Sequence, residues 1–102
     1  MYKIVYTPMF QQDVNEVLDY ISGKLKNPIA ANAFLDALET EILSIRQYPT
    51  AFAPYPSTRN RPTPYYPLRV KNYTAFYVVI DDVIEFRRLL YSRSDLPARL
   101  DI

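Results

Sequence analysis

Basic and tyrosine side chains lie near the ends of the predicted carboxy-terminal strands, where they could bind a phosphate. Arg69 and Lys71 close one predicted strand, Tyr91 ends another, and Arg93 follows that second strand. If these strands pair, Arg93 projects beside Arg69 and Lys71, and the cations could neutralise a bound or scissile phosphate. The Tyr91 phenol could stack on a base or donate a proton. The alternative is a structural turn in which Asp95 pairs with Arg93.

Arg87 and Arg88 form a second candidate site within the last predicted strand. Adjacent strand residues face opposite sides, so one arginine must point away from the layer that covers the sheet or lie at its edge. Glu85 shares the face of Arg87, and the two can form an ion pair of small energetic value. The functional alternative makes Arg87 a contact to phosphate or to a protein partner.

Tyrosines are interleaved with the basic residues of the middle strands. The four positions concerned are Tyr65, Tyr66, Tyr73 and Tyr77. Aromatic side chains among basic ones resemble a surface that binds single-stranded nucleic acid. Tyrosine also suits half-buried strands and protein interfaces, so the sequence leaves both uses open.

The formal net charge of +1 is unevenly distributed along the chain. Residues 1–45 contain three lysines and six acidic residues, whereas residues 46–80 contain five basic residues and no acidic one. The second stretch predicts a basic surface that meets phosphate or an acidic partner, and the alternative is a set of solvated charges without a partner.

The composition excludes several classes of site. The chain has no histidine and no cysteine, which excludes imidazole catalysis, disulfides and cysteine-ligated zinc or iron–sulfur sites. Its single glycine leaves no phosphate-binding loop, and we expect neither a metal nor a cofactor. No apolar run approaches the roughly 18 residues of a membrane span, and no signal-peptide pattern opens the chain. We therefore expect a cytoplasmic protein without a membrane partner.

Two helices are predicted to follow a first strand over residues 2–7. They cover residues 8–25 and 28–47, and each starts with a proline after a capping residue, Thr7 or Asn27. The short link between them predicts an antiparallel hairpin. Apolar residues at helical spacing form the stripe of the second helix: Ile29, Ala33, Phe34, Ala37, Leu38, Ile42 and Ile45.

Three more strands are predicted over residues 66–71, 73–80 and 83–91. Their short turns make an antiparallel meander, and Asn72 is expected to supply the left-handed conformation of the first turn. Alternation in the last strand should place one set of side chains on a common face: Ile84, Phe86, Arg88 and Leu90.

The predicted fold class is therefore α+β. It consists of an N-terminal strand, an antiparallel helical hairpin and a three-stranded antiparallel meander, with all strands in one sheet. The hairpin should cover one face of the sheet and leave the other at least partly open. Prolines interrupt residues 49–64, which predicts an irregular loop that is either functional or a passive connection.

This order of elements resembles the RelE/ParE superfamily of bacterial type II toxin–antitoxin toxins. The resemblance covers nearly the whole chain and predicts a single RelE/ParE-like domain over residues 1–102. The stretches that carry it beyond topology are 19–21, 27–31, 48–49, 70–79 and 89–96.

The resemblance implies a growth-inhibiting toxin of the plasmid-stabilisation type, neutralised by a cognate antitoxin. RelE-like members cleave mRNA on the ribosome without a metal, whereas ParE-like members poison DNA gyrase. In the nuclease, the catalytic residues would be Arg69, Arg93 and Tyr91. In either mode, contacts to the target or to nucleic acid would come from Arg69, Lys71, Arg87 and Arg93. A homodimer is a further expectation.

The sequence departs from the nuclease pattern of the family at several positions. Thr74 stands where a basic residue is expected, Pro67 replaces an arginine, and the usual histidine or tyrosine after the last strand is absent. Glu85 is the only carboxylate inside the strands of the meander that could act as a base. We therefore favour gyrase poisoning, with mRNA cleavage as the alternative and a non-toxic binding module on the same fold as the second alternative.

Overall fold

The computed structural model describes residues 1–56 and 62–100. Part of the predicted loop over residues 49–64, including Arg59 and Arg61, lies outside the described residues. The elements, in chain order, are β1 (Lys3–Tyr6), α1 (Pro8–Asp19), the π-helical turn η1 (Tyr20–Lys24), α2 (Pro28–Ser44), β2 (Tyr66–Val70), β3 (Tyr73–Ile80), β4 (Val83–Tyr91) and α3 (Leu96–Leu100).

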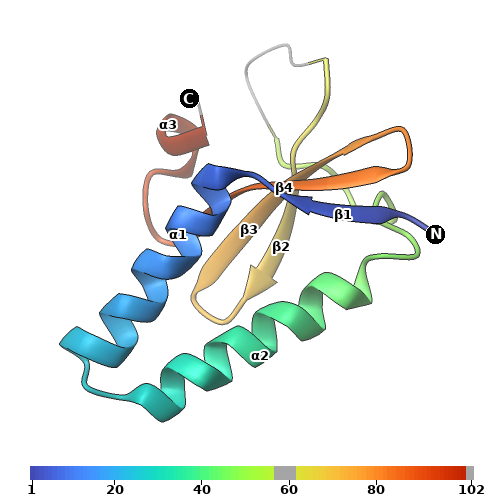
Figure 1. The fold of residues 1–102 in the computed structure, drawn as a ribbon. Helices are drawn as coiled ribbons and strands as arrows, with labels where there is room; N and C mark the ends of the chain where they lie inside the picture. The colour runs from blue at the N-terminus through green and yellow to red at the C-terminus, as the bar shows by residue number, and fades with distance from the viewer. Residues whose placement is uncertain (57–61, 101–102) are drawn as a thin grey trace.

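One four-stranded sheet in the order β1-β4-β3-β2 organises the described part of the chain (Figure 1). β2, β3 and β4 form the predicted antiparallel meander, and β1 adds to β4 in parallel, with Ile4 opposite Ile84. The fold class predicted from the sequence is confirmed. α1 and α2 diverge from their connection like the arms of a V, and the β2–β3 turn lies in the opening between them (Figure 1).

The predicted caps begin both long helices. Thr7 Oγ1 accepts a hydrogen bond from the Phe10 N–H at 3.1 Å, and Asn27 Oδ1 accepts one from the Ala30 N–H at 3.0 Å. These bonds satisfy amide groups that have no partner inside a helix. No helix in the described residues is long and apolar enough to cross a membrane.

The first helix ends earlier than predicted. α1 stops at Asp19, and η1 follows, in which the Leu25 N–H reaches back five residues to the Tyr20 carbonyl at 3.0 Å. Ser22 Oγ donates to the Leu18 carbonyl at 2.8 Å, a contact that bends and loosens a helix. In α2, the predicted stripe is wrong at Ile29, which is 80% exposed in the first turn, and at Ala33, which is also exposed.

Two apolar clusters cover the two faces of the sheet. The cluster under α1 and α2, here the hairpin-side cluster, comprises Phe10, Val17, Phe34, Leu38, Ile42, Ile45, Leu68, Val70, Ala75, Tyr77, Ile84, Phe86 and Leu89. The opposite face carries a smaller far-face cluster of Tyr65, Phe76, Val78, Leu90 and Leu100, with Tyr55 and Leu96 packed against it. The far face is therefore partly covered by α3, by Tyr55 within the proline-rich loop and by Tyr65 directly after it.

A β-bulge in β4 breaks the predicted alternation. Phe76 is opposite Arg88 and Tyr77 is opposite Phe86, which leaves Arg87 as an extra residue. As a result, Leu89 joins the hairpin-side cluster and Leu90 the far-face cluster. The common face predicted for Ile84, Phe86, Arg88 and Leu90 is therefore wrong beyond Phe86, because the extra residue shifts the alternation by one position.

The tight turns of the meander also differ from the prediction. The left-handed residue of the β2–β3 turn is Lys71, with φ of 53°, and not Asn72. Asp81 takes the same conformation in the β3–β4 turn, with φ of 55°. A short polar side chain tolerates this region better than lysine does.

Candidate functional site

An apolar groove lies between the first part of α2 and the end of the sheet. It encloses about 710 Å³ and opens beside the β2–β3 turn. Its lining combines η1 and α2 with the turn and the end of β4: Tyr20, Ile21, Leu25, Ala30, Ala33, Phe34, Lys71, Asn72, Tyr73 and Tyr91. The π-helical turn contributes to this groove because it places both Tyr20 and Leu25 on the same side.

Aromatic rings form the floor of the groove. Tyr73 and Tyr91 are opposite each other in the β3–β4 register, and their rings meet edge to face at 5.7 Å between centroids. Tyr73 also contacts Phe34 edge to face at 5.4 Å. Burial, together with the neighbouring phenols of Tyr20 and Tyr91, raises the pKa of Tyr73. Its hydroxyl therefore stays protonated at neutral pH and can donate a hydrogen bond.

The sheet separates Arg69 from Tyr91. Leu68 and Val70 face the hairpin-side cluster, so Arg69 between them faces the opposite side. Tyr91 faces the hairpin side, opposite Tyr73. The structure thus brings Lys71 and Tyr91 together at the groove and places Arg69 on the far face.

Arg93 lies at the same end of the sheet as Lys71. The Ser92 N–H donates to the Asn72 carbonyl at 2.9 Å, which joins the turn after β4 to the β2–β3 turn. Ser94 Oγ closes that turn by donating to the Tyr91 carbonyl at 2.6 Å. Arg93 lies in this turn between Ser92 and Ser94. Its side chain is exposed, so the guanidinium can reach a partner.

Thr74 occupies the far-face position opposite Arg69. Its hydroxyl lies 2.8 Å from Ser92 Oγ, and the Thr74 side chain is buried. A neutral hydroxyl pair thus lies where the nuclease pattern of the superfamily expects a basic residue.

Arg87 and Glu85 form the predicted ion pair. Arg87 Nε and Nη2 donate to Glu85 Oε2 at 3.2 and 3.0 Å, and the guanidinium lies 5.9 Å from the centre of the Tyr65 ring. Burial acts to lower the pKa of Arg87, but hydrogen bonds with Tyr65 and Glu85 outweigh it and raise the pKa. The carboxylate considered as a general base is therefore engaged by a permanent cation.

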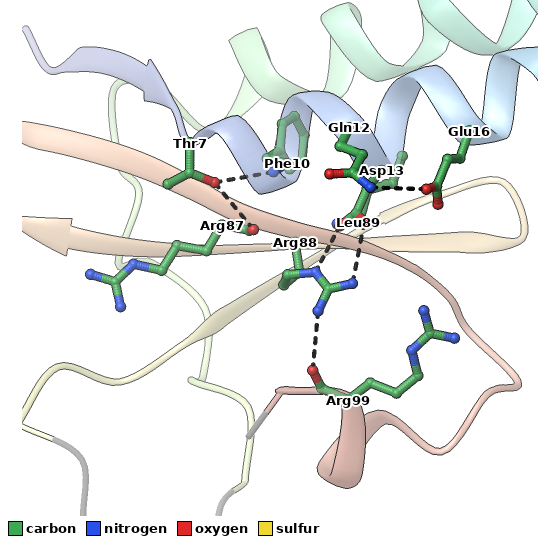
Figure 2. A network of polar contacts seen from close by, with 9 residues as sticks. All are labelled: Thr7, Phe10, Gln12, Asp13, Glu16, Arg87, Arg88, Leu89 and Arg99. Carbon is green, nitrogen blue, oxygen red and sulfur yellow. Dashed lines mark hydrogen bonds and ion pairs between the residues drawn. The ribbon is translucent and has the colours of Figure 1, made fainter. Parts of the chain in front are cut away.

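Asp13 and Arg88 form a buried network that the sequence analysis missed (Figure 2). Arg88 Nε and Nη2 donate to the two Asp13 carboxylate oxygens at 2.8 and 3.2 Å, and the Leu89 N–H donates to Oδ2 at 2.9 Å. Arg88 Nη1 donates to the Arg99 carbonyl at 3.3 Å. A signal existed, because Asp13 is spaced between Phe10 and Val17 on the apolar side of α1.

The four interleaved tyrosines belong mainly to the core. Tyr65 and Tyr77 are buried, and Tyr66 and Tyr73 are half-buried. Tyr77 donates its hydroxyl to the Pro49 carbonyl at 2.7 Å, and burial, followed by the nearby Tyr66, raises its pKa to about 12. These rings hold the sheet and the start of the proline-rich loop and do not present an open stacking surface.

A family of known proteins matches almost the whole chain. The family described as the ParE toxin of the type II toxin–antitoxin system, parDE, matches residues 4–96. The chain belongs to the ParE toxin family. This toxin of the type II toxin–antitoxin class has no match among curated proteins.

Solved structures of other toxins share the fold of this ParE-family toxin. The chromosomal ParDE system from P. aeruginosa matches with a TM-score of 0.72 at 18% identity, over 89% of this chain and 96% of that chain. A copper-bound mutant toxin from Helicobacter pylori matches at 0.59 and 22% identity, over 94% and 99%. The E. coli DinJ-YafQ complex matches at 0.54 and 16% identity, over 89% and 93%.

Proposed function

We propose that this ParE-family toxin inhibits growth by poisoning DNA gyrase and that a cognate antitoxin neutralises it. The observation that carries the choice of target is the separation of Arg69 and Tyr91 on opposite faces of the sheet. RNA cleavage needs cations and proton-transfer groups around one phosphate. A protein target needs only a surface with the right contacts.

The positions of the acid–base candidates support a target other than mRNA. Glu85 lies six positions before Tyr91 in β4, roughly 20 Å at the rise of a strand. Its Oε2 already accepts two hydrogen bonds from Arg87. Glu85 and Tyr91 are therefore too far apart to act on the same scissile bond.

The cations at the groove end of the sheet then act as target contacts. Arg69, Lys71 and Arg93 are all exposed there, two of them in turns. Exposed cations of this kind speed association with an acidic or phosphate-bearing partner and contribute to its affinity. Arg87 is a weaker candidate contact because Glu85 and Tyr65 occupy its guanidinium.

The antitoxin partner is supported by the solved relatives. The similar structures include the ParDE toxin–antitoxin system of P. aeruginosa and the DinJ-YafQ complex of E. coli. The groove of this chain offers exposed apolar side chains for such a partner, among them Leu25 and Tyr91. A homodimer that buries the same side chains is the alternative assembly.

One specific observation keeps mRNA cleavage as a second candidate. The turns that carry Lys71 and Arg93 lie at one end of the sheet, where the Ser92–Asn72 hydrogen bond joins them. Together with Arg69 they could neutralise a phosphate, with Tyr91 at the groove beside Lys71. This candidate requires RNA to bind across the end of the sheet.

Cell-free translation with the purified toxin, followed by primer extension on the message, separates the two targets. The proposal expects an intact message and growth arrest in cells that express the toxin. Codon-positioned cuts that disappear in Arg93→Ala and persist in Lys3→Ala, an exposed lysine on β1, would establish the nuclease instead. Normal growth on expression would leave the non-toxic binding module.

A further inference from the structure

β1 is an edge strand with one side of its backbone turned away from the sheet (Figure 1). The Lys3 N–H donates to the Asp82 carbonyl at 2.8 Å, and the Thr7 N–H donates to the Phe86 carbonyl at 3.1 Å. Backbone groups of successive strand residues point to opposite sides of the strand. The odd-numbered residues of this segment therefore pair with β4, and the even-numbered residues turn their N–H and C=O groups outward.

The outward groups of this edge are complementary to themselves. They belong to Tyr2, Ile4 and Tyr6. If two copies of the chain meet antiparallel with Ile4 of one opposite Ile4 of the other, Tyr2 of each copy lies opposite Tyr6 of the other. Each opposed pair could then exchange both N–H···O bonds, and the two sheets would become one. A row of unpaired backbone groups is a template for association of this kind.

Two side chains from outside the strand already bind its outward carbonyls. Arg46 Nε donates to the Tyr2 carbonyl at 2.9 Å, and Gln11 Nε2 donates to the Tyr6 carbonyl at 3.1 Å. Gln11 belongs to α1, and Arg46 lies shortly after the end of α2. The two bonds engage the carbonyls at both ends of the edge and leave Ile4 between them. A strand that pairs with this edge must break both bonds and displace a charged guanidinium.

The other edge of the sheet is protected by the backbone itself. β2 is the outer strand on that side, and it contains Pro67. Proline has no N–H to offer to a further strand, and it is confined to edge strands and bulges for that reason. β1 contains no proline, so protection of its edge depends on side chains.

We propose that Arg46 and Gln11 guard the free edge of β1 and keep two copies of this chain from joining their sheets by antiparallel pairing around Ile4. This inference goes beyond the proposed function, because it holds for either target of the toxin. Arg46 and Gln11, here the two guards, withdraw the outward carbonyls of Tyr2 and Tyr6 from a second copy. The N–H and C=O of Ile4 alone provide too short a ladder for stable pairing.

A double variant, Arg46→Ala with Gln11→Ala, removes both guards and leaves the sequence of β1 intact. The matched control is Arg69→Ala with Gln12→Ala, whose side-chain hydrogen bonds go to groups only two and four residues along the chain. Sedimentation equilibrium of the full chain over a range of concentrations measures the dimer dissociation constant. We expect the guard variant to have a constant at least about tenfold lower than that of the wild type, and the control to match the wild type.

Hydrogen exchange of individual amides shows whether β1 forms the contact. In the wild type, the amides of Ile4 and Tyr6 should exchange faster than that of Val5, which pairs with β4. In the guard variant, protection of Ile4 and Tyr6 should increase with protein concentration. The protection of Val5 at every concentration reports that the variant is folded.

Gln11→Ala alone provides a second test if the double variant unfolds. Gln11 is exposed on α1, so its substitution leaves the core unchanged. It frees one carbonyl in each copy, and we expect a dimer dissociation constant at least about threefold lower than that of Gln12→Ala.

Three results would overturn the inference. The first is a folded guard variant, double or single, that dimerises no more than its control. The second is a dimer in which Ile4 and Tyr6 remain unprotected, because the copies then meet at another surface. The third is a protected Ile4 amide in the monomeric wild type, which would show that the edge is already paired.

Discussion

Asp13 and Arg88 join three elements at one point. The pair links α1 to β4, and the same guanidinium reaches the carbonyl of Arg99 in α3 (Figure 2). Only 9% of the Asp13 side chain and 11% of the Arg88 side chain are exposed. A buried ion pair adds little net stability, but removal of one partner leaves the other charge buried without compensation.

Asp13→Ala should therefore destabilise the toxin strongly. We expect the free energy of unfolding to fall by about 3–5 kcal/mol in urea titrations, because both Arg88 and the Leu89 N–H lose their acceptor. Glu85→Ala is the control, since it breaks the more exposed pair with Arg87 and should lower the stability by less than about 1 kcal/mol. Equal losses in the two variants would contradict a buried role for Asp13.

Tyr77 makes stability depend on alkaline pH. Its pKa is raised to about 12 in the folded chain, from 10.0 for an unperturbed phenol. Below pH 10 both states keep the proton. As pH rises from 10 to 12 the unfolded chain loses the proton first, so stability falls by up to about 1.4 kcal/mol per pH unit from this group.

Denaturation of the wild type and Tyr77→Phe between pH 9 and 12 measures this contribution. Below pH 10 the variant should be less stable by about 1–3 kcal/mol, because the Pro49 carbonyl loses its donor. Its stability should also fall less steeply above pH 10 than that of the wild type. Parallel pH curves would show that Tyr77 titrates normally.

At the scale of elements, α2 is anchored to the sheet by its buried stripe. Phe34 is 2% exposed and meets Tyr73 edge to face. Phe34→Ala should lower the free energy of unfolding by about 3–5 kcal/mol, measured by chemical denaturation. Phe52→Ala removes a ring that is 73% exposed and should change it by less than about 0.5 kcal/mol. A small loss of unfolding free energy in Phe34→Ala would contradict the packing of α2 against the sheet.

The elements with strong periodicity or caps could be predicted from sequence. Thr7 and Asn27 begin the helices as expected, and the meander forms with β1 added to its edge. α3 was missed, because five residues around Pro97 give no hydrophobic period. The early end of α1 was missed as well, because the competing bond of Ser22 depends on side-chain geometry.

Site prediction depended on details of strand geometry. The ion pair between Arg87 and Glu85 could be predicted because the two residues share a face of the strand. The structure contains this pair. The bulge at Arg87 carries no glycine to mark it, so the positions of Leu89 and Leu90 could not be read from alternation. The groove depends on a π-helical turn and a left-handed lysine, and neither has a clear sequence signal.

At the scale of the whole molecule, the sheet divides two surfaces with different chemistry. The hairpin side presents the tyrosine-lined groove with Lys71, and the far face presents Arg69 beside a small apolar cluster that α3 covers. A partner that binds at the groove end meets Lys71 and the neighbouring turn of Arg93 together. This arrangement suits recognition of a protein better than assembly of one catalytic centre.

A DNA-cleavage assay with purified gyrase tests the central claim most directly. Gyrase, supercoiled plasmid and ATP are incubated with the toxin, and protein-linked DNA breaks are counted after proteolysis. The account predicts breaks that require gyrase and increase with toxin concentration. Arg93→Ala should need about 5–150 times more toxin, as expected for an interface contact worth about 1–3 kcal/mol. Absence of gyrase-dependent breaks at toxin concentrations that cleave mRNA on ribosomes would contradict it.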